Sequence, residues 1–268
     1  MAADGIVEGK QKVTMSTNRC VVCSSEMSRG NFVRCRSCGL VQVLPMPSAR
    51  EIAKLYHEDF DHFKPYVEQI EVHREYFRKK LQEIKHGKTL LDIGCAMGVL
   101  LEEAEKKGFR AQGIDISKDA VAYCRKKGLD VSGKWPEKKL DVITAFQVIE
   151  HERDPLQFMK RVYKLLKKNG LVVLATPKNY WLSRKHPEHV TFWSPRSFRF
   201  LMEKTGFKTI EIRRDTPRPF PLSFAFTRAA DYFPLIAWFL KPIGKLLDRF
   251  DIKNPINPWD DMIVFARK

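Results

Sequence analysis

The chain has 268 residues, which is enough for one large hydrophobic core and a small additional module. Its hydrophobic content of 44% and charged content of 30% exclude an intrinsically disordered chain. Its 48 basic and 32 acidic residues give a formal charge of +16, which indicates either an anionic partner (nucleic acid, a phosphorylated metabolite, a membrane surface) or simply a basic soluble surface.

The beginning of the chain predicts a flexible leader over residues 1–18. The first 19 residues are polar and lack the apolar segment of a secretory signal. The longest apolar run, Phe233 to Leu240, is far shorter than the ~20 residues that span a bilayer. Since four of the six cysteines have metal-ligand spacing, disulfides are not required, and we expect a cytoplasmic protein.

Residues 19–47 contain two Cys-x-x-Cys pairs separated by eleven residues. Four thiolates at this spacing can surround Zn²⁺ tetrahedrally at about 2.3 Å, and such a closed site is structural. The expected ligands are Cys20, Cys23, Cys35 and Cys38. Gly39 suits the turn after the second pair. A nucleic-acid-binding ribbon is the alternative, but the segment lacks dense interleaving of basic and aromatic residues, which favours a scaffold role.

A helical cap is expected over residues 48–88. Ser48 and Glu51 form a capping-box pattern that opens a helix through Leu55 and Tyr56. A second helix is predicted from about Tyr66 to Lys85, because apolar residues recur there at helical spacing.

From Thr89 onward, short apolar strands alternate with helices. This alternation predicts an α/β fold, a doubly wound, Rossmann-like sheet of seven strands covered on both faces, within a domain over residues 89–268. The expected strands are 89–93, 110–114, 129–131, 140–145, 171–175, 207–213 and 262–266. The expected helices are 99–107, 118–127, 155–166 and 194–205.

A long insert occupies residues 216–258, and its seven prolines and many aromatic residues argue for a lid or a binding surface. Apolar residues can line one side of segment 222–250, while Lys241, Lys245 and Arg249 lie elsewhere. This pattern predicts either a core or lid element or peripheral contact with a membrane. We expect Pro242 to interrupt any single helix there.

A loop of small residues joins the first strand of the sheet to its first helix. Small side chains let the backbone approach a ligand, and the helix N-terminus offers free N–H groups. Val99 stands where a dinucleotide-binding Gly-x-Gly-x-x-Gly motif would need glycine. Asp115 ends the next strand, 23 residues after Asp92, where a carboxylate can accept both hydrogen bonds of a ribose diol.

Residues 90–176 resemble the core of class I S-adenosylmethionine-dependent methyltransferases. The motif Asp92-x-Gly94-x-Ala96-x-Gly98 is similar to that family's Asp-x-Gly-x-Gly-x-Gly loop, with alanine at the central glycine. Asp115 matches the ribose-binding acid, and residues 141–151 and 169–177 resemble the fourth and fifth strands with their turns. The cysteine module resembles the N-terminal ribbon of some bacterial and archaeal methyltransferases of small molecules or sugars.

The resemblance implies S-adenosylmethionine as cofactor. The residues that it assigns to donor binding are Asp92, Gly94, Ala96, Gly98, Asp115, Phe146 and Gln147, the last two beside the methionine moiety. The expected adenine segment is short, and Trp135 there either stacks on adenine or packs within the protein.

Glu150 and His151 follow the fourth strand, and His186 and His189 follow the fifth, so these loops can meet over the donor. The pattern resembles two metal-assisted O-methyltransferase groups, the ubiquinone-pathway enzymes and the small-RNA 3′-end 2′-O-methyltransferases. The candidate catalytic residues are therefore Glu150, His151 and His189, with roles as base, as Mg²⁺ ligand or in holding the loop left open. Gln147 replaces an acid of the RNA group, which indicates a weaker Mg²⁺ site or none.

The predicted reaction is methyl transfer from S-adenosylmethionine to oxygen of a small or lipid-linked metabolite, a quinone precursor or a sugar. RNA methylation is the alternative enzyme. A non-catalytic module that binds nucleic acid or a protein partner is the alternative of another class.

Overall fold

A seven-stranded sheet forms the centre of the computed structural model, which describes residues 18–52, 64–178, 183–216, 218, 220–250, 252 and 261–268. The strand order is β5-β4-β3-β6-β7-β10-β9. Its strands are β3 (Thr89–Ile93), β4 (Arg110–Ile114), β5 (Val131–Ser132), β6 (Leu140–Phe146), β7 (Leu166–Pro177), β9 (Lys208–Arg214) and β10 (Asp261–Arg267). The predicted α/β, doubly wound sheet is confirmed.

Strand β10 runs against its neighbours. The pairs from β5 to β7 are parallel, whereas β10 is antiparallel to both β7 and β9. Strand–helix alternation alone predicts parallel strands. Here β9 ends at the carboxyl edge of the sheet, the insert begins there, and the chain re-enters the sheet from that edge and runs back. The insert therefore lies on the edge where α/β sheets bind ligands.

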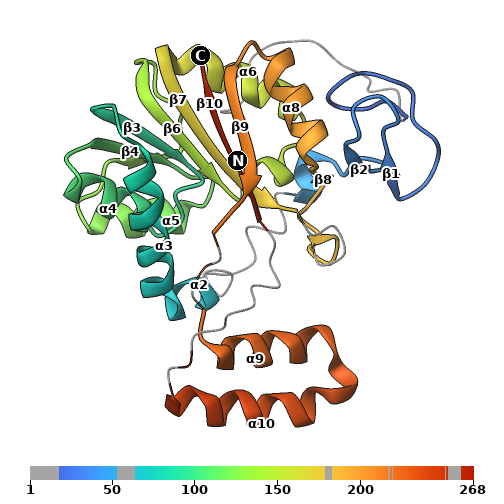
Figure 1. Ribbon diagram of the computed structural model, residues 1–268, viewed down its shortest axis with the longest axis vertical. Coiled ribbons are helices and arrows are strands. Elements are labelled where there is room, and N and C mark those ends of the chain that lie inside the picture. The colour runs from blue at the N-terminus through green and yellow to red at the C-terminus, as the bar shows by residue number, and fades with distance from the viewer. Residues whose placement is uncertain are drawn as a thin grey trace.

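Helices cover both faces of the sheet (Figure 1). Side chains alternate along β3, so that fully buried Leu90 and Leu91 belong to the cores on opposite faces. One face carries α3 (Ile70–Glu83), α4 (Val99–Lys106) and α5 (Lys118–Lys126), and the other carries α6 (Pro155–Leu165) and α8 (Pro195–Lys204).

The helical cap begins as predicted and then departs from the prediction. The Ser48 N–H donates to Glu51 Oε2 at 2.7 Å, and the Glu51 N–H donates to Ser48 Oγ at 3.2 Å, which confirms the capping box. Leu55 and Tyr56 lie outside the described residues.

The single helix expected over residues 66–85 is divided into α2 (Lys64–Glu68) and α3, with a break at Gln69. The Tyr66 ring stacks on His73 with centroids 3.9 Å apart. Residues seven positions apart in one continuous helix would be separated by about 10 Å along its axis, so this stacking requires the break.

The cysteine module is a small sheet that the main domain completes. β1 (Phe32–Arg34) pairs with β2 (Val41–Val43), and β2 pairs with β8 (Thr191–Phe192), a strand that the sequence analysis did not predict. The main domain also holds the module by side chains of α8, because Arg196 donates to the Ser37 carbonyl at 2.8 Å and Lys204 to the Val22 carbonyl at 2.9 Å.

The insert forms a pair of helices side by side at one end of the molecule, outside the layers that cover the sheet (Figure 1). They are α9 (Leu222–Tyr232) and α10 (Ala237–Leu247), joined by the 3-10 turn η3 (Pro234–Ile236) and followed by η4 (Asp248–Phe250). Among the described residues, no helix is both long and apolar enough to span a membrane.

The prediction that Pro242 interrupts any single helix is wrong, because Pro242 lies inside α10. Proline removes one backbone donor, whose helical acceptor would be the carbonyl of Trp238. Trp238 is exposed, so water can satisfy that carbonyl and the helix continues. The predicted leader lies outside the described residues except for Asn18, and the expected domain boundaries stay predictions.

Candidate active site

The donor loop, residues 94–98, turns sharply between β3 and α4. Gly94, Ala96 and Gly98 have φ of 72°, 45° and 73°, all in the left-handed region. A Cβ on Gly98 would lie 2.5 Å from Leu129 Cδ1, and one on Gly94 would lie 2.6 Å from Val148 Cγ2. Only glycine fits these two positions, and the loop therefore packs closely on its neighbours.

Asp115 lies beside this loop at the end of β4. The Ala96 N–H donates to Asp115 Oδ2 at 2.9 Å, and the Ser117 N–H donates to Oδ1 at 2.8 Å. These two hydrogen bonds hold the carboxylate against the donor loop and the start of α5. The loop and the carboxylate are thus brought together as predicted.

Asp92 is buried beneath the loop. Thr144 Oγ1 of β6 donates to Asp92 Oδ1 at 2.7 Å, and this hydrogen bond holds the Asp92 carboxyl against β6. Burial raises the pKa of Asp92 to about 7, the charge of Asp115 adds to this, and the Thr144 hydrogen bond opposes it.

Phe146 and Gln147 follow at the end of β6. The Phe146 ring meets Phe77 and Tyr76 of α3 edge-on, at centroid distances of 5.3 and 5.9 Å. Gln147 has a left-handed φ of 57°, and its Nε2 donates to Asp261 Oδ2 at 3.1 Å. A non-glycine residue held in this conformation is typical of functional sites.

The loops after β6 and β7 meet as expected. Glu150 and His151 lie in the 3-10 turn η2 (Ile149–His151), and the His151 and His189 rings are 4.7 Å apart. Ligand atoms of Glu150, His151 and His189 all lie within 4.8 Å of one another, as do those of His186, Glu188 and His189. Val148 touches Gly94, so this cluster adjoins the donor loop.

Hydrogen bonds orient both central histidines. His151 Nδ1 lies 3.2 Å from the Glu188 carbonyl oxygen. A carbonyl only accepts, so in the neutral ring Nδ1 carries the proton and Nε2 carries the lone pair. His189 Nδ1 lies 2.7 Å from Ser183 Oγ. Burial, together with His151 and His186, lowers the pKa of His189 to about 3, which makes this ring neutral at physiological pH.

Glu150 is the buried carboxyl of the cluster, only 1% exposed. Thr176 Oγ1 donates to its Oε2 at 3.0 Å, while its Oε1 has no hydrogen-bond partner among the described residues. Burial raises the pKa of Glu150 to about 8. One oxygen therefore anchors the turn to β7, and the other is available for a ligand.

Sequence reasoning missed an ionic network beside the site. Lys80 Nζ lies 2.5 Å from Asp215 Oδ1, and both side chains are 1% exposed. Tyr76 also donates to Asp215, and Arg218 lies over the Tyr76 ring and 3.6 Å from Asp261. Lys80 occupies one of the positions of α3 that are otherwise apolar. A basic residue in such a buried stripe could have indicated a buried ion pair.

Two further apolar residues lie after β4 and β5. Ile116, which the sequence analysis did not single out, directly follows Asp115, and its apolar side chain is 59% exposed. Trp135 packs on α6, with the Phe158 ring 5.8 Å away and the Arg161 guanidinium 4.4 Å over its face. These contacts correspond to the packing alternative for Trp135.

The four predicted zinc ligands converge. Cys20 and Cys38 Sγ are 3.5 Å apart, Cys23 and Cys35 Sγ are 3.4 Å apart, and all four lie within 4.8 Å of one another. A tetrahedral zinc site with bonds of about 2.3 Å needs sulfurs about 3.8 Å apart. Ser24 and Gly39, each directly after a Cys-x-x-Cys pair, have φ of 63° and 83° and form matching turns.

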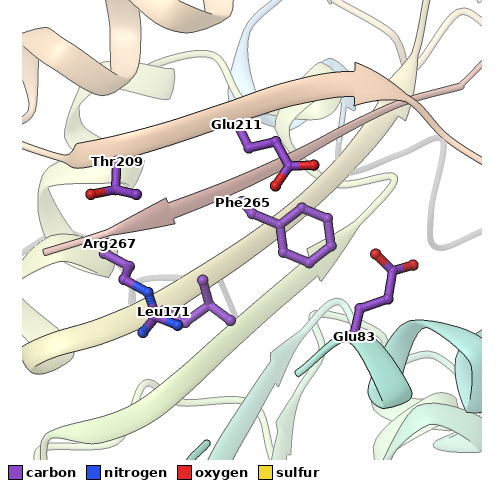
Figure 2. Close-up of a pocket in the computed structure, with 6 residues that line it drawn as sticks. All are labelled: Glu83, Leu171, Thr209, Glu211, Phe265 and Arg267. Carbon is purple, nitrogen blue, oxygen red and sulfur yellow. The ribbon is translucent and has the colours of Figure 1, made fainter. Parts of the chain in front are cut away.

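A shallow pocket lies away from this edge of the sheet (Figure 2). It is near the start of β7 and the end of β10, opposite to the donor loop. Its lining residues are Glu83, Leu171, Thr209, Glu211, Phe265 and Arg267, none of which was a predicted site residue.

The strand order, the donor loop and the carboxylate after β4 define a class I S-adenosylmethionine-dependent methyltransferase fold. A family model described as a methyltransferase domain matches residues 66–212, more than half of the chain, and the chain belongs to this family.

Relatives and solved structures agree with this family. Ubiquinone biosynthesis O-methyltransferases from Caulobacter vibrioides and Pelagibacter ubique are 36% identical over 41% and 44% of this chain, and over 50% and 53% of their own lengths. The chain thus spans about half the length of the curated relatives it matches.

The fold is also similar to a SAM-dependent methyltransferase from Archaeoglobus fulgidus, with TM-score 0.51, 19% identity, and 78% of this chain and 100% of that chain covered. A chain of the Haloferax volcanii complex between the Trm112 methyltransferase activator and a methyltransferase has TM-score 0.56 and 16% identity, with 78% and 97% covered.

Proposed function

We propose that the protein transfers a methyl group from S-adenosylmethionine to a hydroxyl oxygen of a small or lipid-linked acceptor, of quinone-precursor or sugar type. The observation that carries this proposal is the proximity of the Glu150, His151 and His189 cluster to the donor loop, through Val148 and Gly94. The names of the relatives that match this chain support oxygen as the acceptor atom.

The donor site fits S-adenosylmethionine by its own chemistry. The donor supplies a methyl group on a sulfonium cation for in-line transfer. Asp115, beside the loop at the end of β4, is the proposed acceptor of the ribose diol, and Ile116 offers an exposed apolar surface to adenine. Phe146 and Gln147 border the methionine end.

The acceptor hydroxyl needs a group that takes its proton. His151 is the proposed base, because its Nδ1 faces the Glu188 carbonyl and its Nε2 carries the lone pair. His189 positions that ring by edge-to-face contact. Two imidazoles and one carboxylate fit Mg²⁺ poorly, since Mg²⁺ prefers oxygen ligands, so no step of this proposal uses Mg²⁺.

Calorimetric titration with S-adenosylmethionine tests the donor site. We expect saturable binding that Asp115→Ala abolishes and that the control Asp119→Ala, in an exposed position of α5, leaves unchanged. NAD should not bind. If S-adenosylmethionine does not bind while oligonucleotides bind tightly and salt-sensitively, the non-catalytic module replaces this proposal.

Turnover of catechol-type and sugar acceptors tests the base. We expect His151→Ala to reduce kcat by about 10²-fold or more, with donor affinity retained. His189→Ala should cause a smaller loss. Normal turnover by the His151 variant would exclude it as the base.

The cysteine module is proposed to hold one structural zinc ion. The sulfur separations of 3.4 and 3.5 Å between the two Cys-x-x-Cys pairs support this. Elemental analysis should find about one zinc per chain, and the Cys20→Ser/Cys38→Ser variant should contain none. Metal-free, folded wild-type protein would exclude the proposal.

A further inference from the structure

Exposed apolar side chains gather on the insert. Among the described residues, eight of the twelve large apolar side chains that are exposed belong to residues 233–252. Leu235 and Trp238 are 91% and 76% exposed. Monomeric proteins rarely leave such a group open to water, so this surface indicates a partner. The eight residues are Phe233, Leu235, Ile236, Trp238, Phe239, Leu246, Phe250 and Ile252.

Helix α10 has three faces. Gly244 is buried and Ala237, Leu240, Ile243 and Leu247 are half-buried, at the spacing of one helix face. Phe239 and Leu246, continued by Phe250 of η4, form an exposed apolar stripe. Between the two lies a row of cations four residues apart, Lys241, Lys245 and, in η4, Arg249, all exposed, with exposed Trp238 in line with them.

This arrangement favours an anionic lipid bilayer as the partner. An interfacial helix needs an apolar face with cations at its border, and Lys and Arg there reach the head groups. At 11 residues, α10 is too short to span a bilayer but long enough to lie in its surface. The sequence of α10 contains no acidic residue, one acid (Asp248) follows in η4 before Arg249, and the chain has a formal charge of +16.

The charge argues against a second copy of the chain on this surface. A two-fold symmetric contact would place the same patch against itself. The row Lys241, Lys245 and Arg249 would then face or border an identical cationic row, which costs affinity.

A row of rings connects this surface with the donor loop. Phe224 of α9 stacks on Phe220 at 4.6 Å, Phe220 meets His73 at 5.9 Å, and His73 stacks on Tyr66 at 3.9 Å. The charge of Asp92 acts on the Tyr66 hydroxyl, whose pKa is raised chiefly by burial, so the row ends beside the donor loop.

The other end of the insert contacts the histidine loop. Lys185 Nζ lies 5.8 Å from the Phe233 ring centroid, and Lys185 precedes His186 in that loop. The insert therefore adjoins the candidate site at two places, one beside the donor loop and one at the histidine loop.

We propose that α9, η3 and α10 form a docking surface for anionic membranes, and that docking places the candidate site beside the bilayer that holds a lipid-linked acceptor. The apolar stripe enters the head-group region, and the cationic row binds lipid phosphates. The acceptor part of this inference rests on the proposed O-methyltransferase function, whereas the docking part does not.

Vesicle flotation tests the docking surface without any turnover. The full chain should float with mixed phosphatidylcholine and phosphatidylglycerol vesicles, and salt should weaken this. Leu235→Ser/Trp238→Ser should reduce partition about tenfold or more. Lys241→Ser/Lys245→Ser/Arg249→Ser should reduce it about a hundredfold on mixed vesicles, at roughly fivefold per cation, with much less effect on pure phosphatidylcholine.

The matched control is Phe200→Ser, an exposed apolar residue on α8 away from the insert, which should float like the wild type. Donor titration of each variant verifies folding.

Wild-type protein that does not float, or Leu235/Trp238 variants that float equally, would overturn the proposal. Light scattering that finds a dimer made monomeric by Leu235→Ser/Trp238→Ser would identify this surface as a dimer contact instead. Flotation without methyl transfer would leave docking intact and remove only the acceptor assignment.

Discussion

Ala96 holds a backbone conformation that usually belongs to glycine. Its φ of 45° lies in the left-handed region, where a Cβ costs about 1 kcal/mol or more. The Ala96 N–H is bound to Asp115, and Cys124 Sγ donates to the Ala96 carbonyl at 3.2 Å, so the loop cannot relax without losing these contacts. The alanine at the motif's central position is therefore tolerated with strain.

Replacing Ala96 by glycine should relieve that strain. We expect Ala96→Gly to raise the free energy of unfolding by up to about 1 kcal/mol, less the entropy that glycine gains in the unfolded chain. Urea denaturation measures this. Ala104→Gly, buried within α4, is the control and should destabilise by about 1 kcal/mol or more. Equal destabilisation by both substitutions would contradict the strain argument.

Asp92 predicts a pH dependence of stability. Its pKa rises from 3.8 to about 7 on folding, so between these values the native state binds a proton that the unfolded state has lost. The contribution of Asp92 is therefore fully present below about pH 4 and is lost as pH rises through about 7.

Urea unfolding at pH 5 and pH 7 measures how much Asp92 contributes to the change in the free energy of unfolding between these two pH values. Asp92→Asn should lose less free energy of unfolding over that interval than the wild type, by up to about 2 kcal/mol. Identical pH dependence in the two proteins would show that Asp92 is charged throughout.

At the scale of elements, α3 is tied to the edge of the sheet by a buried ion pair. Lys80 of α3 meets Asp215, the residue directly after β9, and Glu83 of α3 pairs with Arg213 of β9. These two ion pairs hold the C-terminal end of α3 against the start of the insert.

Breaking the pair on one side should be costly. Asp215→Ala leaves the buried Lys80 ammonium with Glu83 Oε1, 3.2 Å away, as its remaining acidic partner among the described residues, and we expect a loss of up to about 3 kcal/mol in the free energy of unfolding. Lys80→Met/Asp215→Leu should recover most of the loss, because it removes both charges. The control is Lys79→Met on the exposed side of α3, where an ion pair contributes about 1 kcal/mol or less. A small effect of Asp215→Ala would mean that Glu83 or water compensates the Lys80 charge.

At the scale of the whole molecule, the cysteine module braces the candidate active site. β2 pairs with β8, and the Val43 N–H donates to the Val190 carbonyl at 3.0 Å, directly after His189. Removal of zinc should loosen the module and, through β8, the histidine loop.

Hydrogen exchange with and without a chelator measures this coupling. Amides of residues 190–193 should exchange faster after metal removal, while those of β4 on the far side of the sheet should not change. Unchanged protection at 190–193 would show that the two parts are independent.

Much of this organisation could be predicted, because it depends on short-range patterns. The strands from β3 to β7 begin and end within a few residues of their predicted bounds, except that β7 extends to Leu166–Pro177. Failures occurred where tertiary contacts overrode local propensity. Tyr66 stacking breaks the expected helix, and water-accessible surroundings let α10 continue through Pro242.

The sequence by itself determined the sheet, the donor loop with Asp115 and the four converging cysteines, since strand periodicity and ligand spacing are properties of neighbouring residues. Only the tertiary structure decided which distant groups meet. Tyr76 and Asp215 are 139 residues apart, His151 contacts a loop beyond the next strand, and β8 completes a sheet begun near residue 32. Such pairings depend on how the carboxyl edge of the sheet and its insert fold together, and no local pattern encodes that arrangement.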